Sequence, residues 1–295
     1  MAQLFYNLRL MEPFNYSTIR LPSWHEFKLT IHKFSENWAF RGQANAGWML
    51  NNAIERTDFI RFGNGIEAGF VAEFQRGARN YLSKDETPEH LIEWLALMQH
   101  HGAPTRLLDF SKSPYIAAYF AFEFCHVNDE NYVAVWCINI EHLKRKSLEI
   151  LSQEFGTALQ ESQNLINEKL FDVLFYQNNK SLVFPVEPFR MNRRYSLQQS
   201  IFVSTGTSVA PFMEQLLFLG EDLAKSVVRL EIPATEKKIA LRELQKMNLH
   251  RASLFPDLDG YALSLKFRYS NMKAPDELEI ELKRKAEDHN YPFLP

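Results

Sequence analysis

The sequence predicts an α+β fold, and three observations support this prediction. Helical patterns, in which apolar residues recur three and four positions apart, alternate with short runs rich in Val, Ile, Phe and Trp. No internal repeat and no long Gly-, Ser- or Pro-rich linker divides the 295 residues. Hydrophobic residues make up 46% of the chain, enough to bury a large core. We therefore expect an N-terminal lead-in over residues 1–22 and a single domain over residues 23–295.

Four helices are expected in the first half of the chain. Ser and Thr before a first turn accept hydrogen bonds from free backbone N–H groups, and proline suits the first helical position. The four expected helices begin near Ser23, Glu67, Thr87-Pro88 and Ser113-Pro114. The last of them, YIAAYFAFEF, is apolar nearly all round, which predicts a buried helix. Strands are expected in WAFRGQANAGWML (38–50) and in YVAVWCINI (132–140).

The second half of the chain contains more strand candidates and a charged helical segment. Residues 141–176 read as two amphipathic helices, and we expect a helical insertion or lid over about 141–180. The strand candidates are SLVFPVE, SIFVST and SVVRLEI. Further helices are expected around PFMEQLLFLGE, over Thr235–Met247 and after Pro256.

Charge and cysteine content narrow the function classes. A formal net charge of −3 and a pI near 6.3 give no general electrostatic case for nucleic-acid or membrane binding. The two cysteines, Cys125 and Cys137, form no CxxC pair, so a zinc ribbon is excluded and a reducing cytosol is expected. No basic leader and no apolar run of ~20 residues is present, so the sequence favours a cytoplasmic protein without membrane contact.

Arg41 is the most unusual residue of the expected strands, because it lies at the centre of an apolar run. A buried guanidinium is costly unless an anion or a strong hydrogen-bonding group meets it. Arg41 therefore either has an internal partner or points into a site. We expect Trp38, Phe40 and Trp48 to hold the strand in the core, and Gly42 to let a ligand approach the backbone.

The segment QHHGAPTRLLDFSKSP (99–114) is the densest polar signal, and it lies between two apolar helices. A structural reading pairs Arg106 with Asp109 and lets the histidines cap a helix. A metal site on His100 and His101 is disfavoured, because adjacent ligands need a third ligand at a suitable spacing. The sequence contains no GxSxG, Walker A, HExxH or GxGxxG motif.

Two further clusters carry charge. Arg190, Arg193 and Arg194 in FRMNRR are suited to bidentate contacts with phosphates, although a surface set of salt bridges explains them equally well. In LFPDLDG, one of Asp257 and Asp259 is expected to cap a helix, which leaves the other for a polar contact.

Four segments in this order resemble the FRG domain family, which is named after a triplet that is Phe40-Arg41-Gly42 here. They are FRGQANAGWML, LMQHHGAPTRLLDFSKSPYIAAYFA, RYSLQQSIF and LFPDLDGYAL. The resemblance covers residues 23 to 268, and its most specific part is the QHHG…YFA segment.

A looser similarity links the chain to ADP-ribosyltransferases of the Arg-Ser-Glu type. Those enzymes carry an aromatic-Arg-Gly strand, a serine strand that leads into a helix, and a strand led by a catalytic glutamate. Arg41 resembles the first element, Ser111 or Ser113 the second, and Gln198 or Gln199 stands where the glutamate is found. The resemblance implies a single domain with split, bent β-sheets, flanking helices and a cleft that binds NAD as co-substrate.

The replacement of glutamate by glutamine leaves three readings open. Another carboxylate serves, with Asp109, Asp257 and Asp259 as candidates; the cleft binds without catalysis; or the aligned position is wrong. The resemblance implies catalytic roles for Arg41, Ser111, Gln198 and Asp109. It implies cofactor-binding roles for Phe40, Arg41, Gly42, Gln43, His100, His101, Thr105, Arg106, Ser113 and Tyr119, and it leaves Arg190, Arg193 and Arg194 for the substrate.

Three functions follow as hypotheses. The first is a toxin or defence effector that cleaves NAD and transfers ADP-ribose to RNA or protein, under the control of an antitoxin-like partner. The second is a non-catalytic module that binds a nucleotide or nucleic acid. The third is a metal-dependent nuclease using His100, His101 and the three aspartates, and it ranks last because no ligand spacing supports it. No metal is expected.

Overall fold

A computed structural model describes residues 14–57, 59–63, 65–155, 168–188, 190 and 192–270. Residues 1–13 of the expected lead-in and residues 156–167 of the expected insertion lie outside the described residues. The chain forms two compact units, Met1–Leu249 and His250–Pro295.

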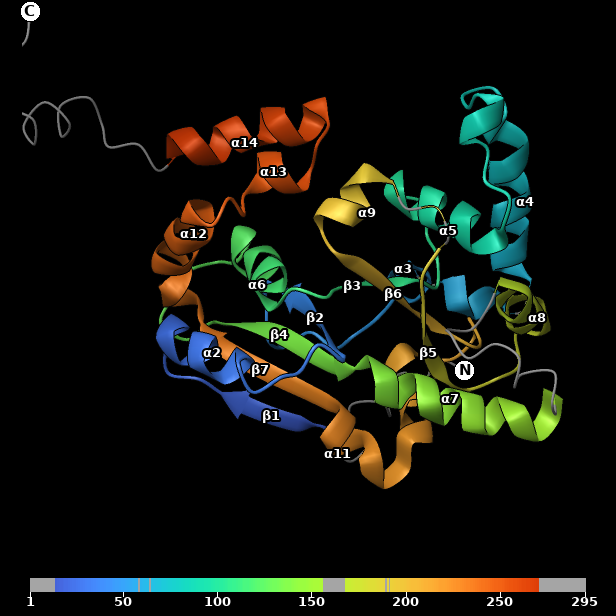
Figure 1. Cartoon of the computed structure of the whole chain (residues 1–295), viewed down its shortest axis with the longest axis horizontal. Helices are drawn as coiled ribbons and strands as arrows, with labels where there is room; N and C mark the ends of the chain where they lie inside the picture. Colours follow the sequence, from blue (N-terminus) through green and yellow to red (C-terminus); the bar gives the residue numbers. More distant parts are fainter. Residues whose placement is uncertain are drawn as a thin grey trace, which may run out of the picture. The chain divides into compact units, whose positions relative to one another are not determined.

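The first unit is built on one seven-stranded sheet with the order β1-β7-β4-β2-β3-β6-β5 (Figure 1). Its strands are β1 (Ser17–Arg20), β2 (Trp38–Gln43), β3 (Leu108–Ser111), β4 (Tyr132–Asn139), β5 (Val183–Val186), β6 (Ser200–Thr205) and β7 (Val227–Pro233). Strands β1 and β7 pair in parallel, and the other neighbours pair antiparallel. The α+β prediction is confirmed.

The junction between β2 and β3 is the narrowest of the sheet. These strands are joined through one aligned pair, Phe40 with Ser111, whereas β2 pairs with β4 from Trp38–Asn139 to Gln43–Ala134. The two halves that the resemblance implies as split sheets are therefore continuous here, and the connection is short. Arg41 lies directly beside it.

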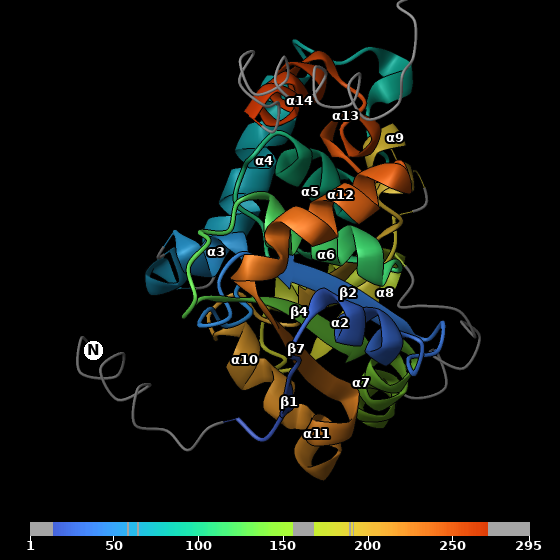
Figure 2. The same cartoon turned by 90° about the vertical axis from the view of Figure 1, so that its left-hand side faces the viewer.

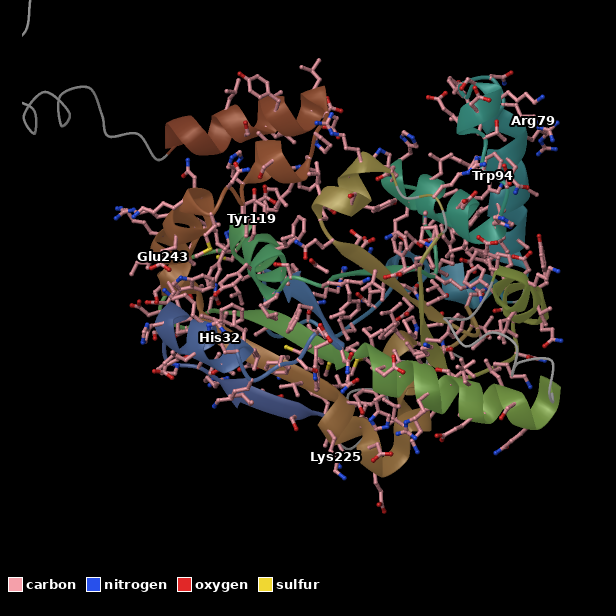
Figure 3. All side chains as sticks on the ribbon, viewed as in Figure 1. His32, Arg79, Trp94, Tyr119, Lys225 and Glu243 are labelled. Atoms are coloured by element: carbon pink, nitrogen blue, oxygen red, sulfur yellow. The ribbon has the colours of Figure 1, made fainter. Side chains whose placement is uncertain are left out.

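The helices of the first unit are α2 (Trp24–Ile31), α3 (Ala53–Arg56), α4 (Ile66–Ala78), α5 (Leu91–His100), α6 (Pro114–Glu123), α7 (Ile140–Phe155), α8 (Glu168–Gln177), α9 (Arg193–Leu197), α10 (Phe212–Gln215), α11 (Leu223–Ser226) and α12 (Lys237–Lys246). Helix α6 and helix α12 lie on one side of the sheet, and α10 and α11 lie on the other (Figure 2). On the first side, Glu243 of α12, labelled in Figure 3, accepts hydrogen bonds from Trp24 and Lys28 of α2.

The capping predictions are confirmed at two helices and wrong at a third. The side chains of Ser23 and Ser113 accept hydrogen bonds from backbone N–H groups in the first turns of α2 and α6. Helix α5, however, begins at Leu91 and not at Thr87-Pro88. Its first turn is closed by the Glu93 carboxylate, which accepts from the backbone N–H groups of two preceding residues. The predicted helix over residues 211–221 is also interrupted, because a 3₁₀ segment (Leu216–Asp222) follows α10.

The helices of the expected insertion contribute to the core. Leu143 and Leu151 of α7 and Phe171 and Phe175 of α8 are at most 2% exposed and belong to the two main clusters of buried residues. The described parts of this segment therefore pack as structural helices, and a role as a lid stays a prediction.

Gly42 has a structural reason that the sequence did not reveal. A Cβ atom at this position would lie 1.8 Å from the backbone oxygen of Ala117. The glycine therefore lets α6 pack against β2 at close range. The expectation that Gly42 also lets a ligand approach the backbone stays a prediction.

The second unit contains α13 (Arg251–Leu254) and α14 (Leu258–Ser270). Asp257 accepts a hydrogen bond from the backbone N–H of Gly260 at 2.6 Å, which is the capping role predicted for one of the two aspartates. In the part of the chain that the structure describes, no helix combines the length and apolar character needed to cross a membrane.

Candidate functional site

An open pocket of about 790 Å³ lies at the end of β2 and contains Arg41. We call it the Arg41 pocket. Its volume is typical of a small-molecule site. Its described lining residues are Arg41, Gly42, Gln43, Ala44, Asn45, Gly47, Trp48, Met49, Asn51, Arg56, Phe120, Phe124, His126, Asn131 and Tyr132. They include two arginines and no carboxylate.

The Arg41 guanidinium has little internal compensation. Its Nη1 donates a hydrogen bond of 2.7 Å to the backbone carbonyl of Asp109, while its buried Nε has no partner among the described residues. No described carboxylate forms an ion pair with it. Burial therefore lowers the pKa of Arg41 to about 10, against a weaker opposing effect of the Asp109 charge. A desolvated cation with so few hydrogen bonds is suited to bind an anionic ligand.

Arg106 shows the opposite situation. Its Nε donates to Glu67 at 2.6 Å, and its two terminal nitrogens donate to Asn178 and to the Thr205 carbonyl. Its backbone N–H also donates to the Glu67 carboxylate, and the ring of Phe175 covers the guanidinium. The side chain is 2% exposed. Arg106 is therefore a structural residue, and its partner is Glu67 instead of the expected Asp109.

The structure places the four predicted catalytic residues on β2, on β3 and in the turn between α9 and β6, but it does not place them all in one pocket. Arg41 reaches the backbone of Asp109 on β3. Ser111, on the same strand, donates from its Oγ to the backbone carbonyl of Gln198 at 2.7 Å and accepts from the Ser113 N–H. Neither Ser111 nor Gln198 is among the described residues that line the Arg41 pocket. The Asp109 carboxylate has a buried Oδ1 with no described partner.

Most of the predicted cofactor-binding residues are engaged internally. Phe40 is a core residue, 3% exposed. Gln43 accepts from the Trp136 indole at 2.8 Å and donates to the Met49 carbonyl at 3.2 Å. Thr105 donates to the Gln99 side chain. The Tyr119 hydroxyl, on the α6 residue labelled in Figure 3, donates to Glu123 at 2.8 Å.

Three of the predicted ligand-binding residues gather at a second, smaller pocket of about 420 Å³. His100 and His101 reach it from the end of α5, and Arg190 reaches it from the loop before α9. Arg190 forms an ion pair with Glu89, so the salt-bridge reading of this cluster is confirmed at one residue. Arg193 and Arg194 begin α9 and do not line this pocket in its described part.

Sequence reasoning missed aromatic and basic residues of the Arg41 pocket that follow β2 and α6. Trp48 was expected in the core, but it is 54% exposed. Phe124 is 61% exposed. Both line the Arg41 pocket, together with Arg56. Arg56 donates to the Asn51 carbonyl at 2.6 Å, and its charge contributes to the lowered pKa of Arg41. The sequence signal for Trp48 was its place after the Asn45-Ala46-Gly47 turn, because turns tend to be at the surface.

No group of three or more His, Cys, Asp or Glu side chains arranged to hold a metal is present within the described ranges. The rings of His100 and His101, for which the sequence disfavours a metal site, contact each other edge to face.

Comparison with known proteins identifies one family. Neither a search of curated proteins nor a search of solved structures gives a match. Residues 36–130 match the model of the FRG domain, a narrower range than the residues 23 to 268 of the resemblance. The matched range contains β2, the turn with Trp48, the QHHG segment and α6, so it includes most of the Arg41 pocket. The match supports the FRG resemblance over residues 36–130.

Proposed function

We propose that the Arg41 pocket binds the phosphate groups of a nucleotide, with NAD as the candidate that the resemblance implies. One observation carries this proposal: Arg41 is a desolvated cation with one hydrogen bond and no ion pair among the described residues, and it lines a pocket without described carboxylates. A phosphate oxygen supplies both the missing acceptor and the missing negative charge.

The test is calorimetric titration of the full chain with NAD. Arg41→Gln is expected to weaken NAD binding about tenfold or more, because charge-assisted hydrogen bonds to phosphate are lost. Arg145→Gln is the matched control, since Arg145 is an exposed arginine of α7 that pairs with Glu149. This control is expected to bind NAD like the wild type.

Thermal unfolding of the same variants separates binding from folding. Arg41→Gln is expected to keep the wild-type unfolding temperature, because the replaced charge lacks an internal counter-charge. An unchanged affinity for NAD in Arg41→Gln would contradict the proposal. Loss of folding in this variant would contradict it as well, because Arg41 would then be a structural residue.

A second proposal is that the bound NAD is turned over, as in the ADP-ribosyltransferases that the sequence resembles. The observation that favours it is the sheet order: the three resembling segments belong to β2, β3 and the turn into β6, which are adjacent. In this reaction the nicotinamide–ribose C–N bond breaks and nicotinamide leaves with the electron pair. A nucleophile of a protein or RNA bonds to the ribose carbon, and its proton passes to a base, for which Asp109 is the candidate.

The test of turnover is the release of nicotinamide from NAD in the presence of a cell extract. The proposed effector role predicts release by the wild type and its loss in Arg41→Gln and in Asp109→Asn. Binding of NAD without release would favour the non-catalytic module. The partners proposed for the active form are an RNA or protein acceptor and an inhibitory, antitoxin-like protein.

A further inference from the structure

We propose that Trp48 forms the base subsite of the Arg41 pocket, so that the ligand is a nucleotide whose base stacks on the exposed indole. The inference rests on the proposed binding of phosphate at Arg41 and adds the chemical class of the group beside that phosphate. Trp48 is the most exposed tryptophan that the structure describes, at 54%, and it lines the same pocket as Arg41.

The turn that presents Trp48 is fixed on both sides. Before it, the Ala46 backbone donates to the Tyr132 carbonyl at 2.8 Å and accepts from Arg229 at 3.1 Å. After it, the Met49 carbonyl accepts from Gln43. Gln43 is itself held by the buried Trp136 indole. These contacts belong to the backbone beside Trp48 and not to its ring.

The turn is also closed internally. The Asn45 side-chain oxygen accepts a hydrogen bond from the Gly47 N–H at 2.7 Å. The backbone carbonyl of Asn45 accepts a second one from the Trp48 N–H at 3.2 Å. A ring exposed on a restrained backbone loses little conformational freedom when a ligand stacks on it. An indole exposed without this support would be a common surface feature.

The surroundings of Trp48 favour a nucleotide over an uncharged aromatic ligand. Arg41 and Arg56 both line the pocket, so the aromatic surface lies beside two cations. Phe124 adds a second exposed ring on the same lining, and His126 and Asn131 add polar groups. A flat aromatic base joined to phosphate combines the two properties that this lining can bind.

The test compares inorganic pyrophosphate with ADP, two ligands that share phosphates and differ in the nucleoside. The wild type is expected to bind ADP about tenfold more tightly than pyrophosphate, which is the affinity that stacking of one base contributes. Trp48→Ala is expected to remove this advantage and leave the affinity for pyrophosphate unchanged. Trp48→Phe keeps an aromatic face and is expected to retain most of the advantage.

Tyr81→Ala is the matched control, because Tyr81 is another exposed aromatic residue, at 87%, and it is not among the described lining residues of the Arg41 pocket. It is expected to bind both ligands like the wild type. Quenching of tryptophan fluorescence by ADP, absent in Trp48→Phe, provides an independent readout of contact with the indole. Unchanged thermal unfolding of Trp48→Ala shows that the effect is on binding.

The outcomes separate this inference from the proposed function. Arg41-dependent binding of pyrophosphate without any Trp48-dependent advantage for ADP would overturn the base subsite and leave the phosphate site intact. Binding of ADP that depends on Trp48 and not on Arg41 would overturn the phosphate site alone. Absence of binding for both ligands would overturn both, and Trp48 would then be a candidate contact for another macromolecule.

Discussion

At the scale of single residues, burial determines which charged side chains are available for chemistry. Arg41 and Arg106 look alike in the sequence, since both lie in polar motifs within apolar surroundings. Arg106 is neutralised by Glu67, whereas Arg41 has no such partner among the described residues. The difference depends on a carboxylate that lies 39 residues away along the chain, so local sequence could not supply it.

Glu55, which precedes the pocket residue Arg56 in the sequence, gives a pH prediction at this scale. Burial raises the pKa of Glu55 from 4.5 to about 7, against the lowering effects of two backbone N–H donors and of Arg56, and the Glu214 charge raises it further. Because the pKa is raised in the folded state, its stabilising contribution is present below pH 4.5 and is lost as the pH rises through about 7.

We therefore expect the wild type to lose up to roughly 3 kcal/mol of folding free energy, relative to Glu55→Gln, between pH 4 and pH 8. Glutamine keeps the oxygen that accepts from the backbone N–H groups of Asn52 and Phe212. Chemical denaturation of both proteins across this pH range measures the difference. Parallel pH profiles for the two proteins would show that Glu55 does not titrate as expected.

At the scale of elements, the helices and strands follow from local pattern, and their ends follow from tertiary contacts. The strand over YVAVWCINI and the helix after Ser113 were predicted close to their observed bounds, because their apolar runs are continuous. The start of α5 was misplaced, because Glu93 and not Thr87 supplies the cap. Capping depends on the direction of a side chain, which a pattern of residue types does not show.

The contact between α6 and β2 gives a prediction at this scale. Gly42→Ala is expected to destabilise the fold by about 3 kcal/mol or more, because the new methyl group overlaps the Ala117 carbonyl and the helix must shift. Gly77→Ala is the control, since a Cβ at this position in α4 meets nothing within 4 Å. Alanine is the better helix former, so this control is expected to stabilise the protein slightly. Equal unfolding temperatures for the two variants would contradict the close packing.

At the scale of the whole first unit, a single buried network connects segments far apart in the sequence. Arg106 joins Glu67 of α4, the residue that follows α8, and the last residue of β6. Asn178 of the same network also accepts from the Ser208 N–H at 2.7 Å. The network therefore fixes α4 and the end of α8 against the sheet.

Arg106→Gln is expected to destabilise the protein by about 3–5 kcal/mol, because the Glu67 carboxylate would stay buried without its partner. Denaturant-induced unfolding of this variant, beside Arg145→Gln as an arginine control, measures the effect. A loss below about 1 kcal/mol, typical of a surface ion pair, would show that the network is dispensable.

The sequence by itself determined the α+β class, most elements and the FRG resemblance, because these depend on periodicity and on motifs local in the chain. Only the tertiary structure decided which motif residues are structural. It assigned Gly42 to helix packing, Arg106 to a buried ion pair and Ser111 to the Gln198 carbonyl, and it moved Trp48 from the core to a pocket. The physical reason is that burial and counter-charges come from residues distant in the sequence. Whether a side chain still has hydrogen-bonding or ion-pairing capacity for a ligand is therefore known only when its neighbours in space are known.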